Sequence, residues 1–115
     1  MAVKDEWRWT LLIGVPDAVE QVDAAEVMAR AVAAKRPPAG DRVRLERYDE
    51  GDAAQVLHRG PFATEPATVQ GLHGFIESEG LALRGLHHEI YLSDLRRAAP
   101  ENLRTVIRQP VSARR

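Results

Sequence analysis

The sequence lacks several features that would indicate particular classes of protein. It has no cysteine among its 115 residues, which excludes disulfides and thiolate metal sites and is typical of a reducing compartment. No apolar run approaches the roughly 20 residues that a membrane helix needs. The first residues also lack the apolar segment of a signal peptide. We therefore expect a cytoplasmic protein that does not act on a membrane.

An excess of one charge is also missing. Sixteen Lys and Arg residues stand against seventeen Asp and Glu residues, for a formal net charge of -1. This balance provides no general attraction to phosphates, so we expect no direct contact with nucleic acid. With 44% hydrophobic and 29% charged residues, the composition is that of a folded protein. The length predicts one domain over residues 1–115, with 112–115 as a flexible tail.

Hydrophobic spacing and turn residues predict the element order β-α-β-β-α-β-β. The predicted strands are 8–15, 42–48, 53–59, 87–94 and 105–111, and the predicted helices are 17–35 and 65–79. Asp17 and Glu20 have the spacing of a capping box for the first helix, and Thr64 is the expected N-cap of the second. Pro110 indicates that the last strand is an edge strand. The fold class is therefore α+β, with an antiparallel-rich sheet and two helices.

The two helices are expected to bury one stripe each, and one pair of strands to form a hairpin. The stripes are Val22, Ala25, Ala29 and Val32 in the first helix and Val69, Leu72 and Ile76 in the second. The segments 42–48 and 53–59 flank a turn at 50–52, which predicts that they pair with each other.

The segment 87–94 carries the most informative polar residues. Alternation along a strand puts His87, Glu89 and Tyr91 on one face, and we expect Ile90 and Leu92 on the other face to pack against a helix. A carboxylate in an apolar pocket attracts cations, because Coulomb attraction strengthens as water is excluded. Surface pairing of Glu89 with a nearby arginine is the plainer alternative, and the sequence leaves both open.

Aromatic side chains could form the walls of such a pocket. Trp7 and Trp9 share one face of their predicted strand. An aromatic ring beside a bound cation contributes about 0.5–2 kcal/mol of cation–π attraction. We therefore count both tryptophans as candidate ligand-binding residues.

Metal and cofactor sites are not predicted. The four histidines are His58, His73, His87 and His88. Their spacing matches no zinc motif, and adjacent His87 and His88 point to opposite faces of a strand, so hydrogen-bonded structural roles are favoured. The glycines do not form a phosphate loop, and there is no G-x-S-x-G nucleophile motif.

Three runs of residues carry a family resemblance: WRWTLLIGVPD at 7–17, DEGDAAQVLHRGP at 49–61, and the segment 87–111 that begins HHEIYLSD. With these runs the chain resembles the C-terminal part of GyrI-like small-molecule-binding proteins. The resemblance implies β-α-β-β modules of the SHS2 kind, with a ligand groove between two modules. Phe62 stands where the family often has tyrosine, and Leu95 where it often has proline.

The resemblance also implies what completes the groove and what occupies it. Only six residues precede Trp7, so the family's first module is missing, and we expect a second copy of the chain to complete the groove as a homodimer. The ligand would be a hydrophobic, aromatic or cationic small molecule, bound for drug or toxin sensing, sequestration or resistance. The expected ligand-binding residues are Trp7, Trp9, His58, Phe62, Glu89 and Tyr91.

Two alternatives to ligand binding follow from the same resemblance. One is a hydrolase of cyclopropane-containing genotoxins, with Glu89 as general base and Tyr91 orienting water, provided that burial raises the pKa of Glu89. The other is an interaction module that contacts gyrase or another protein.

Overall fold

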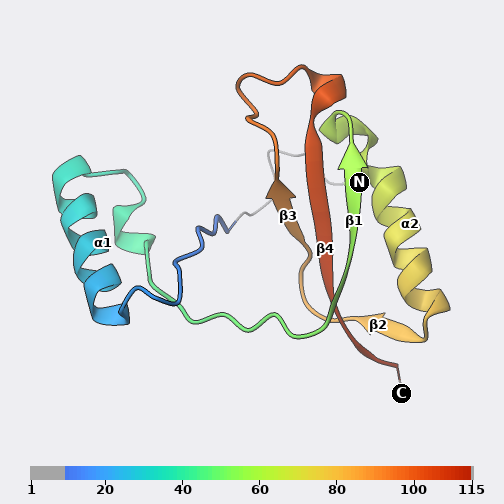
Figure 1. Ribbon diagram of the computed structural model, residues 1–115, viewed down its shortest axis with the longest axis horizontal. Coiled ribbons are helices and arrows are strands. Elements are labelled where there is room, and N and C mark those ends of the chain that lie inside the picture. The colour runs from blue at the N-terminus through green and yellow to red at the C-terminus, as the bar shows by residue number, and fades with distance from the viewer. Residues whose placement is uncertain (1–9, 115) are drawn as a thin grey trace. The chain divides into compact units, whose positions relative to one another are not determined.

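The computed structural model describes residues 10–114. The chain divides into two compact units, unit 1 over residues 1–47 and unit 2 over residues 48–115. Figure 1 shows the helices and strands of both. Trp7 and Trp9 lie outside the described residues, so their expected role in a pocket wall stays a prediction.

Unit 1 is built around one helix, α1 (Gln21–Lys35), followed by the 3₁₀ turn η2 (Gly40–Arg42). The helix ends at Lys35 as predicted, and Arg36 closes it with a left-handed backbone (φ 46°). The predicted start at Asp17 is wrong. The preceding turn is closed by the backbone, with Val19 N donating to Pro16 O at 3.0 Å, and Glu20 is an N-cap without a side-chain hydrogen bond.

Two of the predicted strands do not form in the described residues. Residues 10–15 and 43–48 have no regular secondary structure, so the predicted hairpin at 42–59 is wrong. Its second arm does form a strand, β1 (Ala53–Arg59), but β1 pairs with the last strand of the chain. Alternation alone predicts a strand and cannot identify its partner, which here lies about fifty residues further along the chain.

Unit 2 is an antiparallel sheet covered by one helix. Its elements after β1 are η3 (Phe62–Thr64), α2 (Glu65–Ser78), β2 (Leu81–Leu83), β3 (His88–Tyr91), η4 (Pro100–Asn102) and β4 (Arg104–Ala113). Strands β1, β2 and β3 all pair with β4 in antiparallel register. Figure 1 shows β4 between β1 and β3, with α2 alongside β1. The predicted α+β class with an antiparallel sheet and two helices is confirmed.

The prediction that the last strand is an edge strand is wrong, because β4 is the central strand. The N–H and C=O of one strand residue point to the same edge, and Pro110 O accepts a hydrogen bond from Arg84 N at 2.9 Å. The missing N–H of Pro110 therefore points at residues 84–87, the segment between β2 and β3 where β4 has no strand partner on that edge. The strand also continues to Ala113, two residues into the segment expected as a tail.

The core of unit 2 lies between α2 and one face of the sheet. Leu72 and Ile76 of α2 pack with Ile107 and Val111 of β4, and Val69 packs against this cluster. The predicted stripe of the second helix is therefore confirmed. Thr64 is the N-cap as expected, although its hydroxyl makes no cap hydrogen bond.

The register of β3 corrects one prediction about faces. Glu89 lies directly opposite Ile107, and Tyr91 lies opposite Thr105. Directly opposed residues share a face, so Glu89 and Tyr91 lie on the face that α2 covers. Ile90 lies opposite Val106 on the other face, so the expectation that Ile90 packs against a helix is wrong.

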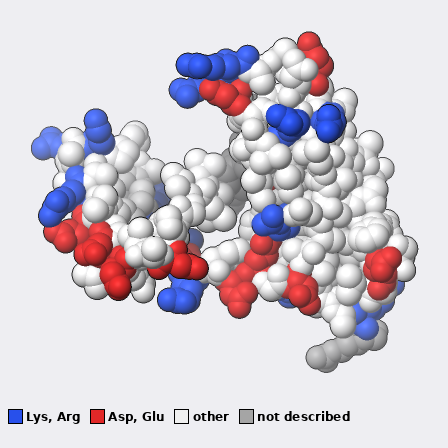
Figure 2. All heavy atoms as spheres, viewed as in Figure 1, with Lys and Arg blue, Asp and Glu red and all other residues white. Residues whose placement is uncertain are grey.

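Charges of both signs are spread over the visible surface of unit 2, with uncharged surface between them (Figure 2). Among the described residues, no helix has the length and apolar character that crossing a bilayer requires.

Candidate functional site

The polar cluster around Glu89 is the candidate site, and three elements of unit 2 supply it. Strand β3 carries Glu89 and Tyr91, η3 carries Phe62, and Glu65 is the first residue of α2. Gly60 makes this arrangement possible, because its φ of 115° reverses the chain between β1 and η3. Its N–H donates to Leu103 O at 2.8 Å, which ties this turn to the start of β4.

Glu89 is shielded from solvent and contacts two polar side chains of its own segment. Its side chain is only 11% exposed. The Tyr91 hydroxyl donates a hydrogen bond to Glu89 Oε2 at 2.9 Å, and His87 Nε2 lies 3.9 Å from Glu89 Oε1. His87 and Tyr91, which were predicted to share a face with Glu89, thus both contact it.

These contacts fix the protonation states of the cluster. The neighbouring His87 is the largest influence on Glu89 and, with Glu65 and Tyr91, lowers its pKa to about 2 against the opposing effect of burial. The same contact with Glu89 raises the pKa of His87. Burial, with a smaller contribution from Glu89, raises the pKa of Tyr91 to about 12. At neutral pH the cluster therefore holds an ionised Glu89 and a neutral Tyr91.

The charge on Glu89 favours the cation-binding hypothesis over the hydrolase hypothesis. An ionised, largely buried carboxylate is suited to attract a cation. A general base works best when its pKa lies near the working pH. The hydrolase hypothesis expected burial to raise the pKa of Glu89, but the contacts with His87, Glu65 and Tyr91 outweigh burial and lower it.

Phe62 and Tyr91 form an aromatic corner beside the carboxylate. Their ring centroids lie 5.8 Å apart with an interplanar angle of 76°, an edge-to-face arrangement. The predicted site residues Phe62, Glu89 and Tyr91 are therefore brought together by the fold.

His58 of β1 is buried on the same face of the sheet, since it and Tyr91 both lie opposite Thr105, and both of its ring nitrogens are engaged. Nε2 lies 3.0 Å from Pro61 O, which can only accept, so Nε2 carries the proton. Nδ1 then accepts from the Thr68 hydroxyl at 2.7 Å. These bonds join β1 to the turn before α2 and to α2 itself, so the contacts of His58 position the elements that carry Phe62 and Glu65.

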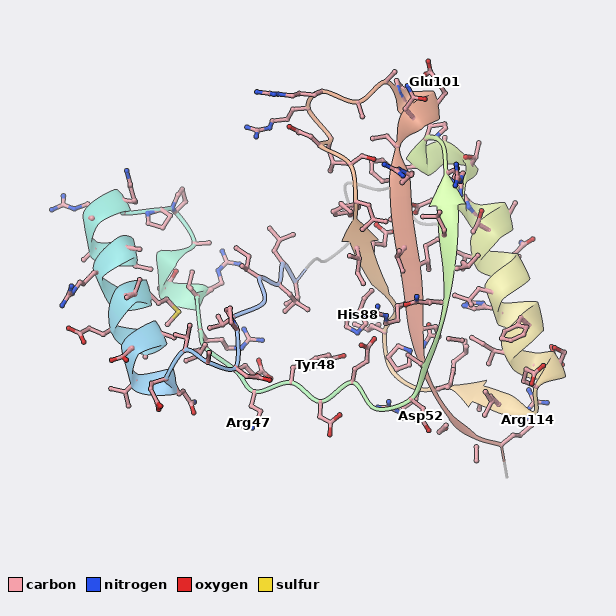
Figure 3. The ribbon with its side chains drawn as sticks, in the orientation of Figure 1. Arg47, Tyr48, Asp52, His88, Glu101 and Arg114 are labelled. Carbon is pink, nitrogen blue, oxygen red and sulfur yellow. The ribbon has the colours of Figure 1, made fainter. Side chains whose placement is uncertain are left out.

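The other two histidines lie apart from Glu89. His88 is on the opposite face of the sheet, where its Nε2 lies 2.7 Å from the Tyr48 hydroxyl, and Figure 3 shows these two side chains close to each other. His73 lines a hollow of about 240 Å³ between α2 and β2. Within residues 10–114, no group of three or more His, Asp or Glu side chains is arranged to hold a metal ion.

Sequence reasoning missed Glu65, a buried carboxyl that contributes to the lowered pKa of Glu89. It also missed Thr105, which is completely buried on the same face of the sheet. An acidic residue in the first turn of a helix is common, because it interacts favourably with the helix dipole. The signal for Glu65 was therefore indistinguishable from ordinary helix capping.

Comparison with known proteins agrees with this fold. Residues 12–112 match the family profile of the GyrI-like small molecule binding domain. A crystal structure of a hydrolase from Listeria innocua is similar with a TM-score of 0.72 and 40% identity, over 85% of this chain and 52% of that one. An uncharacterized conserved protein from Listeria innocua has a TM-score of 0.73 and 42% identity, over 85% of this chain and 50% of that one.

The chain thus spans about half the length of these two proteins. No curated protein matches it.

Proposed function

Since the chain belongs to the GyrI-like small-molecule-binding domain family, we propose that it binds a hydrophobic, aromatic monocation against Glu89. The observation that carries this proposal is a carboxylate whose side chain is only 11% exposed and which contacts His87 and Tyr91, and these contacts lower its pKa to about 2. A carboxylate held in its charged form away from water attracts a cation more strongly than a surface carboxylate does.

The aromatic corner of Phe62 and Tyr91 supports the aromatic part of the proposal. The Tyr91 ring lies beside the carboxylate, since its hydroxyl hydrogen-bonds to it, and the Phe62 ring packs edge-to-face against Tyr91. A flat or aryl-substituted cation could contact these rings while its charge faces Glu89, and each such contact contributes about 0.5–2 kcal/mol. A role in sensing or sequestering a drug or toxin in the cytoplasm, and the homodimer, remain proposals of the same kind.

Isothermal titration calorimetry with tetraphenylphosphonium tests the proposal. Glu89→Gln keeps the shape of the side chain and removes its charge, so we expect tetraphenylphosphonium affinity to fall about tenfold or more, equivalent to about 1.4 kcal/mol or more. Triphenylphosphine oxide is a neutral analogue, and its affinity should not change in the variant.

Glu79→Gln is the matched control, because Glu79 is exposed at the far end of α2. It should bind tetraphenylphosphonium as the wild type does. A wild-type protein that fails to bind any aromatic cation, or that binds the neutral analogue equally well, contradicts the proposal.

Hydrolysis is the second candidate, supported by the description of one similar structure as a hydrolase. In the predicted reaction a water oxygen bonds to one carbon of a cyclopropane as the ring C–C bond breaks. The electron pair passes to the other carbon, which takes up a proton. The low pKa of Glu89 makes it a weak base, so the proton of the attacking water would need another acceptor. Interaction with gyrase stays a prediction.

A further inference from the structure

Two arginines lie side by side at one end of the sheet of unit 2. Arg59 ends β1, Arg104 begins β4, and the antiparallel register puts them directly opposite each other. Gly60 N donates to Leu103 O at 2.8 Å, so the adjacent pair of arginines is a non-hydrogen-bonded pair, in which the two Cα atoms lie about 4.5 Å apart. Figure 1 shows these two strand ends together, and Figure 2 shows two basic groups close to each other at this end of the sheet.

Both arginine side chains lie on the face of the sheet opposite Glu89. Their chain neighbours His58 and Thr105 are buried on the face that α2 covers, so the arginines point to the other face. Both arginines are exposed, and within residues 10–114 neither guanidinium group makes an ion pair or a hydrogen bond. Like charges directly opposite each other on a sheet are destabilising. An anion that contacts both guanidinium groups would remove this repulsion.

A hollow of about 330 Å³ provides space for such an anion. The residues that line it are Arg59, Glu101, Asn102, Leu103 and Arg104. A guanidinium group can donate two parallel hydrogen bonds to a phosphate or a carboxylate, so the two arginines supply a fitting set of donors. The side-chain amide of Asn102 makes no hydrogen bond within the described part of the chain, and it can donate as well.

Glu101 limits the kind of anion that the hollow can accept. Its carboxylate lines the same space but forms no ion pair with either arginine within residues 10–114. Two positive groups and one negative group leave the lining with one net positive charge. This charge suits a single small oxyanion, whereas each further phosphate of a polyanion would add repulsion against Glu101.

We propose that this hollow is a second binding site, in which Arg59, Arg104 and Asn102 hold one phosphate group, either free phosphate or a small phosphate monoester. Phosphate is favoured over a carboxylate because it has enough oxygen atoms to accept from both guanidinium groups at once. The site lies on the face of the sheet opposite Glu89, so it does not depend on the proposed binding of an aromatic cation.

Phosphorus-31 NMR titration of inorganic phosphate at constant ionic strength tests the proposal. We expect saturable binding to the wild type, and a loss of about tenfold or more in Arg59→Gln and in Arg104→Gln. Arg97→Gln is the matched control, because it removes the same charge from an exposed arginine that pairs with Asp94, and it should bind phosphate as the wild type does.

Glu101→Gln tests the same site by a gain of affinity, which a misfolded variant could not produce. It removes the negative charge from the lining, so phosphate should bind about twofold or more tighter. Methyl phosphate separates the two sources: affinity equal to that of inorganic phosphate supports a monoester, and a clearly weaker affinity supports the free ion. A wild type without saturable binding, or equal losses in Arg97→Gln and Arg104→Gln, overturns the proposal.

Discussion

The two units of the chain contain similar kinds of residue but reach very different degrees of burial. None of the described residues of unit 1 is buried, whereas unit 2 buries Leu72, Ile76, Ile107 and Val111 in one cluster. In unit 1 the apolar side chains of Leu11, Ile13 and Val22 are exposed. An amphipathic helix gains most of its stability from the surface that it packs against, and residues 10–47 of unit 1 contain no strand that α1 could pack on.

Unit 2 owes its stability to one shared strand. In unit 2 one strand, β4, pairs with the three others and presents its buried side chains to α2. A single central strand thereby connects residues that lie far apart in the sequence. Unit 1 is held by local contacts, such as the backbone hydrogen bond from Arg36 N to Val32 O at 2.9 Å that ends α1.

The largest expected effect comes from removing a core side chain of unit 2. Ile107 is 0% exposed, so Ile107→Ala should destabilise the protein by about 2–5 kcal/mol, through lost burial and the cavity left behind. Val27→Ala in α1 is the matched change in unit 1, where the side chain is 64% exposed, and it should alter stability by less than about 0.5 kcal/mol.

Urea unfolding followed by circular dichroism measures both variants. Similar losses for Ile107→Ala and Val27→Ala would show that unit 1 is packed as tightly as unit 2, and the contrast between the units would then be wrong.

A smaller effect is expected from the hydrogen bonds that join the elements of unit 2. His58→Leu removes the hydrogen bonds of the ring to Pro61 O and to the Thr68 hydroxyl. Pro61 O still accepts from Thr64, but the Thr68 hydroxyl loses its acceptor, so the change should cost about 1–3 kcal/mol. His73→Leu in the partly exposed part of α2 is the control and should stay within about 0.5 kcal/mol. Urea unfolding measures both variants. If His58→Leu is as stable as His73→Leu, the hydrogen bonds of His58 contribute no net stability and its side chain acts only by packing.

Much of unit 2 could be predicted from local sequence. The spacing of Val69, Leu72 and Ile76 predicts the buried side of α2, and Gly60-Pro61 predicts the end of β1. Alternation correctly groups His87 with Glu89, because the period of a strand is a local property. These signals depend on a few neighbouring residues and need no knowledge of the partner element.

Other features could not be predicted, because they depend on partners distant in the sequence. In the sequence Pro110 is typical of an edge strand. It fits the central strand β4 because its missing N–H faces residues 84–87, which lie between β2 and β3 and do not pair with β4 as a strand. The sequence of β3 alone does not show which of its two faces α2 covers. The apolar Ile90 suggested its own face, whereas the pairing of Glu89 with Ile107 shows that α2 covers the face of Glu89. Glu65 joins the site only through the packing of α2 on the sheet.

The smallest expected effect is a pH dependence of stability that belongs to unit 2 alone, since all four histidines of the chain lie there. The pKa of His87 is raised by its contact with Glu89, so the folded state binds the proton more tightly than the unfolded state. This contribution is fully present below the unfolded pKa of about 6.5 and is lost as the pH rises through the folded value.

Glu89 sets the lower limit of the pH range in which its contact with His87 stabilises the fold, because its pKa is lowered to about 2. Its own contribution is present above the unfolded pKa of about 4.3 and is lost as the pH falls toward 2. At pH 5.5 both charges are therefore in place. The difference in urea midpoint between wild type and His87→Gln should be larger at pH 5.5 than at pH 8.5, and small at both because His87 is partly exposed to solvent. His73→Gln should show no such dependence, and an equal difference at the two pH values would mean that the contact between His87 and Glu89 contributes no stability.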